Sequence, residues 1–244
     1  MRPLFAPEML KVWEQGHAMH QVDKALTLLL AAFPDMNRDK LAALSIGQRD
    51  AYLLELREMT FGPKLDCFAE CPGCKGRLEF NIKTTDIRFL PLPDEKKQEL
   101  ELRYGNLVLR YRMPNSLDLA AVAGLRDVDT ACNLLVQRCV LQAIRDGVSI
   151  DCGDLSADVR TELAAQMAKH DPQAEVLLDL HCPECGHQWQ MVFDIVSYFW
   201  SELNAQSRRL LYDVHVLAQA YGWHESDILS MSDTRRQFYI GMVT

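Results

Sequence analysis

The stretches Cys71-Pro72-Gly73-Cys74 and Cys182-Pro183-Glu184-Cys185 decide the fold expected of this chain. Each is a Cys-x-x-Cys pair, and residues that alternate between apolar and polar follow each of them, which is typical of a strand. Each pair therefore predicts a knuckle, a tight turn that directs two thiolates at one point before a strand begins. Two knuckles supply four sulfur ligands, the set that tetrahedral Zn²⁺ takes in closed sites. The sequence thus predicts one zinc ion per chain, bound by Cys71, Cys74, Cys182 and Cys185.

The two pairs lie unusually far apart in the sequence. Compact zinc ribbons separate their pairs by roughly 15–20 residues, whereas residues 75–181 separate Cys74 from Cys182. We interpret this segment as a β-hairpin and helices inserted between the two halves of a zinc ribbon. Because four cysteines leave no coordination position open, the zinc is expected to be structural and not catalytic.

Alternatives exist for these cysteines. A dithiol oxidoreductase would use each pair separately, but a thioredoxin-like pair opens a helix after a strand, and here a strand follows each pair. Two disulfides are the other reading, suited to a secreted chain. Cys67, four residues before Cys71, or a nearby histidine is the rival ligand. Cys132 and Cys139 are expected to be core thiols, and Cys152 a thiol of a loop or of the core.

The composition indicates a soluble globular protein. The 244 residues are 48% hydrophobic and 25% charged, and 26 Lys and Arg against 34 Asp and Glu give a formal net charge of −8. This acidic balance opposes binding to nucleic acid, which depends on neutralising phosphates. No run of eighteen apolar residues is present, and the first residues lack a signal-peptide pattern. We therefore expect no membrane span and a cytoplasmic protein with reduced cysteines.

Hydrophobic periodicity predicts an α+β fold that is mainly helical. We expect an N-terminal helical region over residues 1–63 and a C-terminal helical region over 195–244. Between them, residues 64–194 form the split zinc-ribbon-like β region with its inserted hairpin and helices. The three regions are expected to form one compact unit.

Within the insertion, the clearest prediction is a hairpin over residues 100–113. Gly105-Asn106 has the composition of a two-residue turn with glycine first, and its register places Glu101 opposite Arg110 and Glu99 opposite Arg112. A helix is expected to follow over residues 129–145. The charged, proline-flanked residues 91–98 have the character of a linker.

No catalytic motif is apparent, so the chain is expected to be a non-enzyme. Two segments have the composition of a protein-binding surface. The aromatic and arginine-rich C-terminal stretch contains Trp223, Arg235 and Arg236, and Trp13 lies near the N-terminus. Trp and Arg are enriched at interface hot spots. The alternative is that these aromatic residues dock short helices on the body of the protein.

Three stretches resemble the T-even-phage baseplate protein family: residues 49–62 before the first knuckle, residues 182–189, and residues 220–229 followed by Arg235-Arg236. The chain is most similar to zinc-knuckle members encoded in phage-tail-like contractile injection system clusters. The resemblance covers most of the chain. It brings no catalytic residue, and the zinc rests on the cysteine spacing alone.

The resemblance implies a structural or assembly protein of the baseplate or central hub of a contractile tail. Its partners would be baseplate, hub, spike or tape-measure proteins, and it would lie in the cytoplasm of the producing bacterium or within the assembled particle. A zinc-ribbon nucleic-acid-binding regulator is the alternative from another class, and the net charge opposes it.

Overall fold

The computed structural model describes residues 1–89 and 99–243, so the linker predicted over residues 91–98 lies outside the described residues. The predicted α+β class is confirmed. The helices are α1 (Ala6–Gly16), α2 (Gln21–Ala32), α3 (Arg38–Ala43), α4 (Ile46–Phe61), α5 (Thr84–Ile87), α6 (Ser116–Val122), α7 (Val128–Cys139), α8 (Ala157–His170), α9 (Ile195–Tyr221), α10 (Glu225–Ser230) and α11 (Asp233–Ile240). The strands are β1 (Lys64–Glu70), β2 (Arg77–Lys83), β3 (Leu100–Tyr104), β4 (Leu107–Tyr111), β5 (Val140–Arg145), β6 (Val148–Ser149), β7 (Val176–His181) and β8 (Gln188–Phe193).

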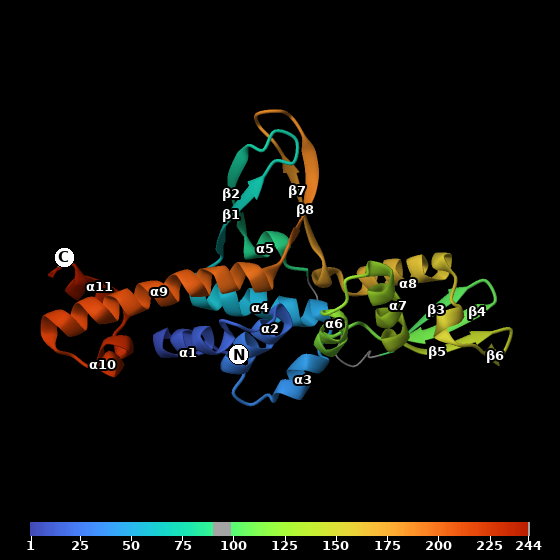
Figure 1. Cartoon of the computed structure of the whole chain (residues 1–244), viewed down its shortest axis with the longest axis horizontal. Helices are drawn as coiled ribbons and strands as arrows, with labels where there is room; N and C mark the ends of the chain where they lie inside the picture. Colours follow the sequence, from blue (N-terminus) through green and yellow to red (C-terminus); the bar gives the residue numbers. More distant parts are fainter. Residues whose placement is uncertain (90–98, 244) are drawn as a thin grey trace.

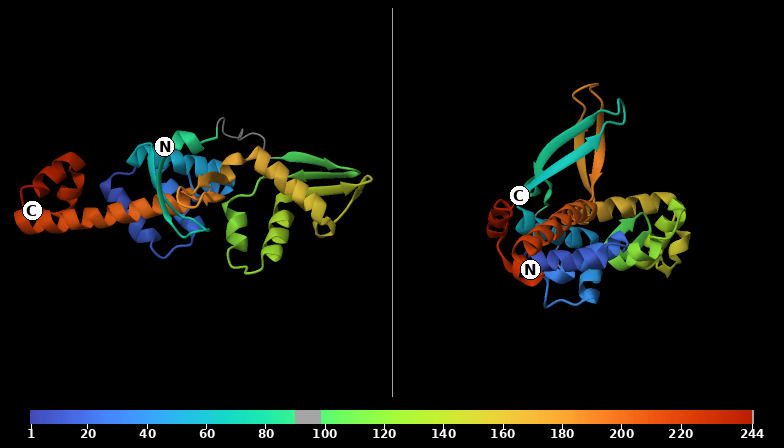
Figure 2. Two further views of the ribbon diagram at one scale, coloured as in Figure 1. Left: turned by 90° about the horizontal axis from the view of Figure 1, so that it is seen from above. Right: turned by 60° about the vertical axis from the view of Figure 1, so that its left-hand side comes forward.

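The molecule is elongated, and two β-hairpins project from its middle (Figure 1). Helices α1–α4 and the first half of α9 form the helical body. The far end of α9 carries α10 and α11, while the sheet β3-β4-β5-β6 and helices α7 and α8 form the opposite end of the molecule. The hairpins β1–β2 and β7–β8 stand next to each other above the body, as two further views confirm (Figure 2). Their turns, which hold the knuckles, are the part of each hairpin farthest from the body.

The core of the body joins the N-terminal helices to the first half of α9. Helix α4 lies at its centre, because its apolar residues are buried on more than one side and include Leu53, Leu54 and Leu56. They belong to one cluster with residues of α2 and with Phe199 and Leu203 of α9. Burying each such side chain stabilises the fold by about 1.5–3 kcal/mol. The body therefore has a hydrophobic core that does not depend on the knuckles.

The inserted hairpin has the predicted register. Tyr104 pairs with Leu107, and Glu101 lies opposite Arg110. Gly105 has a φ of 60°, as the turn requires. The charged side chains do not meet directly across the strands, since Glu99 forms an ion pair with Arg110 and Glu101 forms one with Arg103. Arg112 turns to another element because a buried carboxylate lies within its reach.

The helix predicted over residues 129–145 is also wrong in its second half. Helix α7 ends at Cys139, and Val140–Arg145 forms β5, which pairs with β4. Asp146 and Gly147 follow with φ of 51° and 79°. Two positive φ values in succession are typical of the turn that closes a tight hairpin. The apolar residues of this short segment are spaced in a way that fits a helix or a strand. The segment forms a strand because the edge of β4 offers it backbone hydrogen bonds.

One of the two cysteines predicted to be core thiols of this helix is not buried. Cys139, at the end of α7, is buried as predicted, whereas Cys132 is exposed and is not a core thiol. Cys139 is the only buried residue of α7. The helix is therefore held by its end and only loosely by its side, which the spacing of apolar residues does not reveal.

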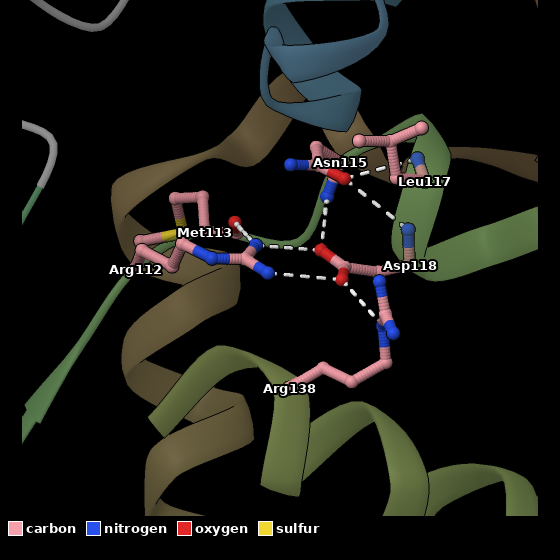
Figure 3. Close-up of polar contacts among 6 residues, drawn as sticks. All are labelled: Arg112, Met113, Asn115, Leu117, Asp118 and Arg138. Carbon is pink, nitrogen blue, oxygen red and sulfur yellow. Dashed lines mark hydrogen bonds and ion pairs between the residues drawn. The ribbon is translucent and has the colours of Figure 1, made fainter. Parts of the chain in front are cut away.

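A buried carboxylate joins the inserted sheet to the helical body (Figure 3). Asp118 of α6 is 0% exposed, and Arg112, from the end of β4, donates to it from both terminal nitrogens at 2.6 and 2.9 Å. Arg138 of α7 donates from Nε at 2.8 Å, and the backbone N–H of Asn115 at 3.0 Å. Asn115 in turn forms a bridge with Ser45, immediately before α4. Asp118 thus joins the end of β4 and helix α7 to α6, next to the point where Asn115 contacts the body.

This network predicts a specific loss of stability in acid. Burial opposes ionisation of Asp118, but hydrogen bonds from Arg112, Asn115 and Arg138 outweigh it and lower its pKa. A carboxyl group with a lowered native pKa contributes stability above its unfolded pKa of about 3.9, and that stability is lost as the pH falls through the native pKa. Urea unfolding between pH 6 and pH 2 should therefore show a decline below about pH 4 that is shallower in Asp118→Asn. Equal slopes would contradict the assignment.

Candidate metal centre

The two knuckles have the same backbone structure. In the first, the N–H of Cys71 donates to Gly76 O at 2.9 Å and the N–H of Lys75 to Cys71 O at 2.9 Å. In the second, Cys182 donates to His187 O at 2.9 Å and Gly186 to Cys182 O at 3.0 Å. Each turn thus closes by the same pair of hydrogen bonds. The repeated Cys-Pro-x-Cys sequence accounts for the likeness, because proline fixes φ at the first turn residue.

The structure brings the four predicted ligands together although they come from distant parts of the chain. Their sulfur atoms all lie within 4.8 Å of one another. Cys71 Sγ is 3.6 Å from Cys185 Sγ, and Cys74 Sγ is 3.6 Å from Cys182 Sγ. Zn–S bonds of about 2.3 Å in a tetrahedron place sulfurs about 3.8 Å apart. The four cysteines are therefore close enough to hold one metal ion.

The four thiols differ in environment. Cys71 and Cys182 are fully buried between the hairpins, whereas Cys74 and Cys185 are exposed on the outer side. Burial opposes ionisation of Cys71, but the backbone N–H groups of Cys74 and Gly73 and the neighbouring thiols outweigh it and lower its pKa to about 7. Thiolate is the form that binds metals. The backbone of its own turn thus favours the metal-binding form of Cys71.

Side chains and glycines bring the knuckles into contact. A Cβ at Gly76 would lie 2.5 Å from Glu184 Oε2, and one at Gly73 would lie 3.4 Å from the His187 side chain. Glu184 itself reaches to 3.8 Å from Cys74 Sγ. The missing side chains let the two turns approach closely. The sequence of the two motifs does not predict this contact, because the need for glycine at these positions arises only when the two turns lie next to each other.

The position after the second cysteine of each knuckle predicts opposite effects of two substitutions. Lys75 and Gly186 occupy it with φ of 64° and 73°. A left-handed conformation costs a non-glycine residue about 1–2 kcal/mol. Gly186→Ala should therefore raise the apparent dissociation constant for the metal by about tenfold, while Lys75→Gly should leave it unchanged or lower it. Competition with a chromogenic chelator measures both, and a matching loss in the two variants would contradict the prediction.

The rival ligands do not join the group of four sulfur atoms. Cys67 belongs to the core of the body, where its Sγ lies 3.9 Å from Leu65 O. His187 stacks against Trp189 with ring centroids 6.0 Å apart. Among residues 1–89 and 99–243, the four knuckle cysteines are the one group of three or more metal-binding side chains that comes together. The same residues contain no helix that is long and apolar enough to cross a membrane.

The model of the T4 bacteriophage base plate protein family matches residues 9–200. The chain belongs to this family. Comparison with curated proteins and with solved structures finds no match. The predicted resemblance is thus confirmed at the level of the base plate family, and a structural role in a phage base plate follows from it.

The base plate family match spans the body, both hairpins and the inserted sheet, and it ends within α9. Three of the predicted partner-binding residues, Trp223, Arg235 and Arg236, lie beyond it. Trp223 stacks on Tyr221 with centroids 4.4 Å apart, and Arg235 lies over the ring of Tyr239 at 5.7 Å. Trp13, inside the match, donates to Asn204 Oδ1 at 2.8 Å. The Trp13 contact joins α1 to α9, whereas Arg235 and Tyr239 both lie in α11 and Arg235 stays exposed.

The prediction that Arg236 lies on a partner-binding surface is wrong. It is 2% exposed, and its guanidinium donates to Asp213 at 3.1 Å and to Asp233 at 2.6 Å. A buried arginine engaged in this way stabilises the attachment of α11 to α9 and is not available to a partner. Two adjacent arginines in the sequence do not reveal which of them points inward.

Proposed function

We propose that this chain is a non-enzymatic building or assembly protein of the baseplate or central hub of a contractile, phage-tail-like particle. The observation that carries the proposal is the family match over residues 9–200. In this role the elongated body binds neighbouring hub, spike or tape-measure proteins through its surfaces. The protein acts in the cytoplasm of the producing bacterium, where such particles assemble.

The proposal includes one structural zinc ion at Cys71, Cys74, Cys182 and Cys185. Sulfur spacings near 3.6 Å suit a tetrahedral ion, and soft thiolate ligands favour zinc among the common metals. Four protein ligands leave no position for a substrate, so the ion holds the hairpins together and performs no reaction. The net charge of −8 disfavours the alternative function, a zinc-ribbon regulator that binds nucleic acid.

Deleting the gene tests the role directly. We expect producing cells without it to contain no complete, sheathed particles by electron microscopy, and a wild-type copy to restore them. Mass spectrometry of purified particles then distinguishes a component, which is retained, from an assembly factor, which is not. Complete particles in the deletion strain would overturn the proposal.

A further inference from the structure

The outward face of the β7–β8 hairpin carries an apolar pair that nothing in the described part of the chain covers. Leu177 and Val192 lie directly opposite each other across the two strands and are 44% and 58% exposed. Leu178, the next residue along β7, points the other way and packs against the core of the body. Strand geometry therefore turns Leu177 and Val192 away from the protein.

The face also carries an exposed carboxylate, and its hairpin has no cation. The next pair towards the knuckle is Asp179 with Gln190, whose side chains are hydrogen-bonded at 2.9 Å. The segment from residue 175 to 194 contains four carboxylates, Glu175, Asp179, Glu184 and Asp194, and no lysine or arginine. Asp194 caps α9 and Glu184 reaches towards Cys74, so Asp179 is the carboxylate that lies beside the apolar pair. The hairpin of β1–β2, by contrast, has four cations and three carboxylates over residues 64–83. The two hairpins are similar in backbone structure but differ in charge.

The metal centre adds to this charge. Four thiolates around one divalent cation carry a net charge of −2, and they lie at the tips of the hairpins. This step rests on the proposed zinc. A projecting ribbon with an apolar pair at its base and negative charge towards its tip suits an occupant with apolar side chains next to lysine or arginine.

We propose that the outward face of β7–β8, formed by Leu177, Asp179, Gln190 and Val192, docks a basic segment of a partner protein. The apolar side chains of that segment cover Leu177 and Val192, and its cations lie over Asp179. A second copy of this chain is disfavoured as the occupant, because a symmetric contact would bring two cation-free hairpins together. Nucleic acid and anionic membranes are repelled by the same charge.

The test uses the full-length, zinc-loaded protein and a fluorescent 12-residue peptide of alternating leucine and lysine, with a leucine and glutamate peptide as the charge control. Val192→Lys places a cation on the face, and Phe68→Lys is its matched control, since Phe68 is 56% exposed on β1 of the other hairpin. We expect Val192→Lys to weaken binding of the lysine peptide at least about tenfold and Phe68→Lys by less than about twofold. The glutamate peptide should not bind.

Amide chemical-shift mapping locates the bound peptide. Shifts centred on Leu177, Asp179, Gln190 and Val192 support the proposal, whereas shifts elsewhere, equal effects of the two substitutions, or equal binding of both peptides would overturn it. Elemental analysis of each variant confirms that one zinc per chain remains, and size exclusion detects dimers, which would also overturn it. Because these measurements do not depend on particle assembly, they separate failure of the docking face from failure of the baseplate role.

Discussion

Cys71→Ser is expected to lower the zinc content from one ion per chain to nearly none. Cys71 is 0% exposed, is held by the backbone of its own turn, and faces Cys185 across the gap between the hairpins. A serine hydroxyl stays protonated at neutral pH and does not replace the thiolate. Structural zinc contributes about 10–16 kcal/mol of binding free energy in small zinc domains, so the hairpins should lose their mutual contact. Elemental analysis of the purified protein measures the metal.

The loss should be local. The body has its own core around α4, so hydrogen exchange is expected to accelerate in β1–β2 and β7–β8 and to change little in α4. Cys67→Ala is the matched control, because it removes a buried sulfur of β1 that is not a ligand, and it should keep one zinc per chain. Full metal content in Cys71→Ser, or equal loss in both variants, would refute the proposed site.

The second large effect is expected at the junction between the inserted sheet and the body. Asp118→Ala removes the acceptor of Arg112, Arg138 and the Asn115 N–H at once. Breaking a buried ion pair costs about 3–5 kcal/mol. Since the two arginine side chains are 28% and 37% exposed and regain some hydration, we expect a loss of about 2–4 kcal/mol in the free energy of unfolding. Urea denaturation measures this change.

Asp127→Ala provides the comparison for Asp118→Ala. Asp127 is an exposed N-cap of α7 that accepts from the Thr130 N–H at 2.8 Å, and removing it should cost about 1 kcal/mol. A double-mutant cycle between Asp118 and Arg138 then isolates their coupling. If Asp118→Ala costs no more than Asp127→Ala, the buried network does not hold the inserted sheet to the body.

Local patterns in the sequence predict elements whose partners are near in the chain. The turn at Gly105-Asn106 and the register of β3 with β4 follow from adjacent residues. The repeated Cys-Pro-x-Cys motifs likewise predict two matching turns, and metal chemistry predicts that they meet. Asn115 and Asp118 form a capping pattern that marks the start of α6. No local pattern predicts that two arginines converge on Asp118.

Patterns compatible with two structures were decided by neighbours that are distant in the sequence. Residues 140–145 form β5 because β4 offers an edge, and Cys132 is exposed because little packs on the side of α7. Arg236 points inward because Asp213 of α9 lies beneath it, while Arg235 does not.

The sequence by itself determined the two knuckles, the four cysteines that come together in them and the mainly helical α+β class, because each depends on residues a few positions apart or on the chemistry of thiols. Only the tertiary structure decided how the hairpins stand away from the body, which of their faces stays uncovered, and how one buried carboxylate holds the inserted sheet. These features depend on contacts between segments far apart in the chain, and hydrophobic spacing records that a residue is buried without recording what covers it.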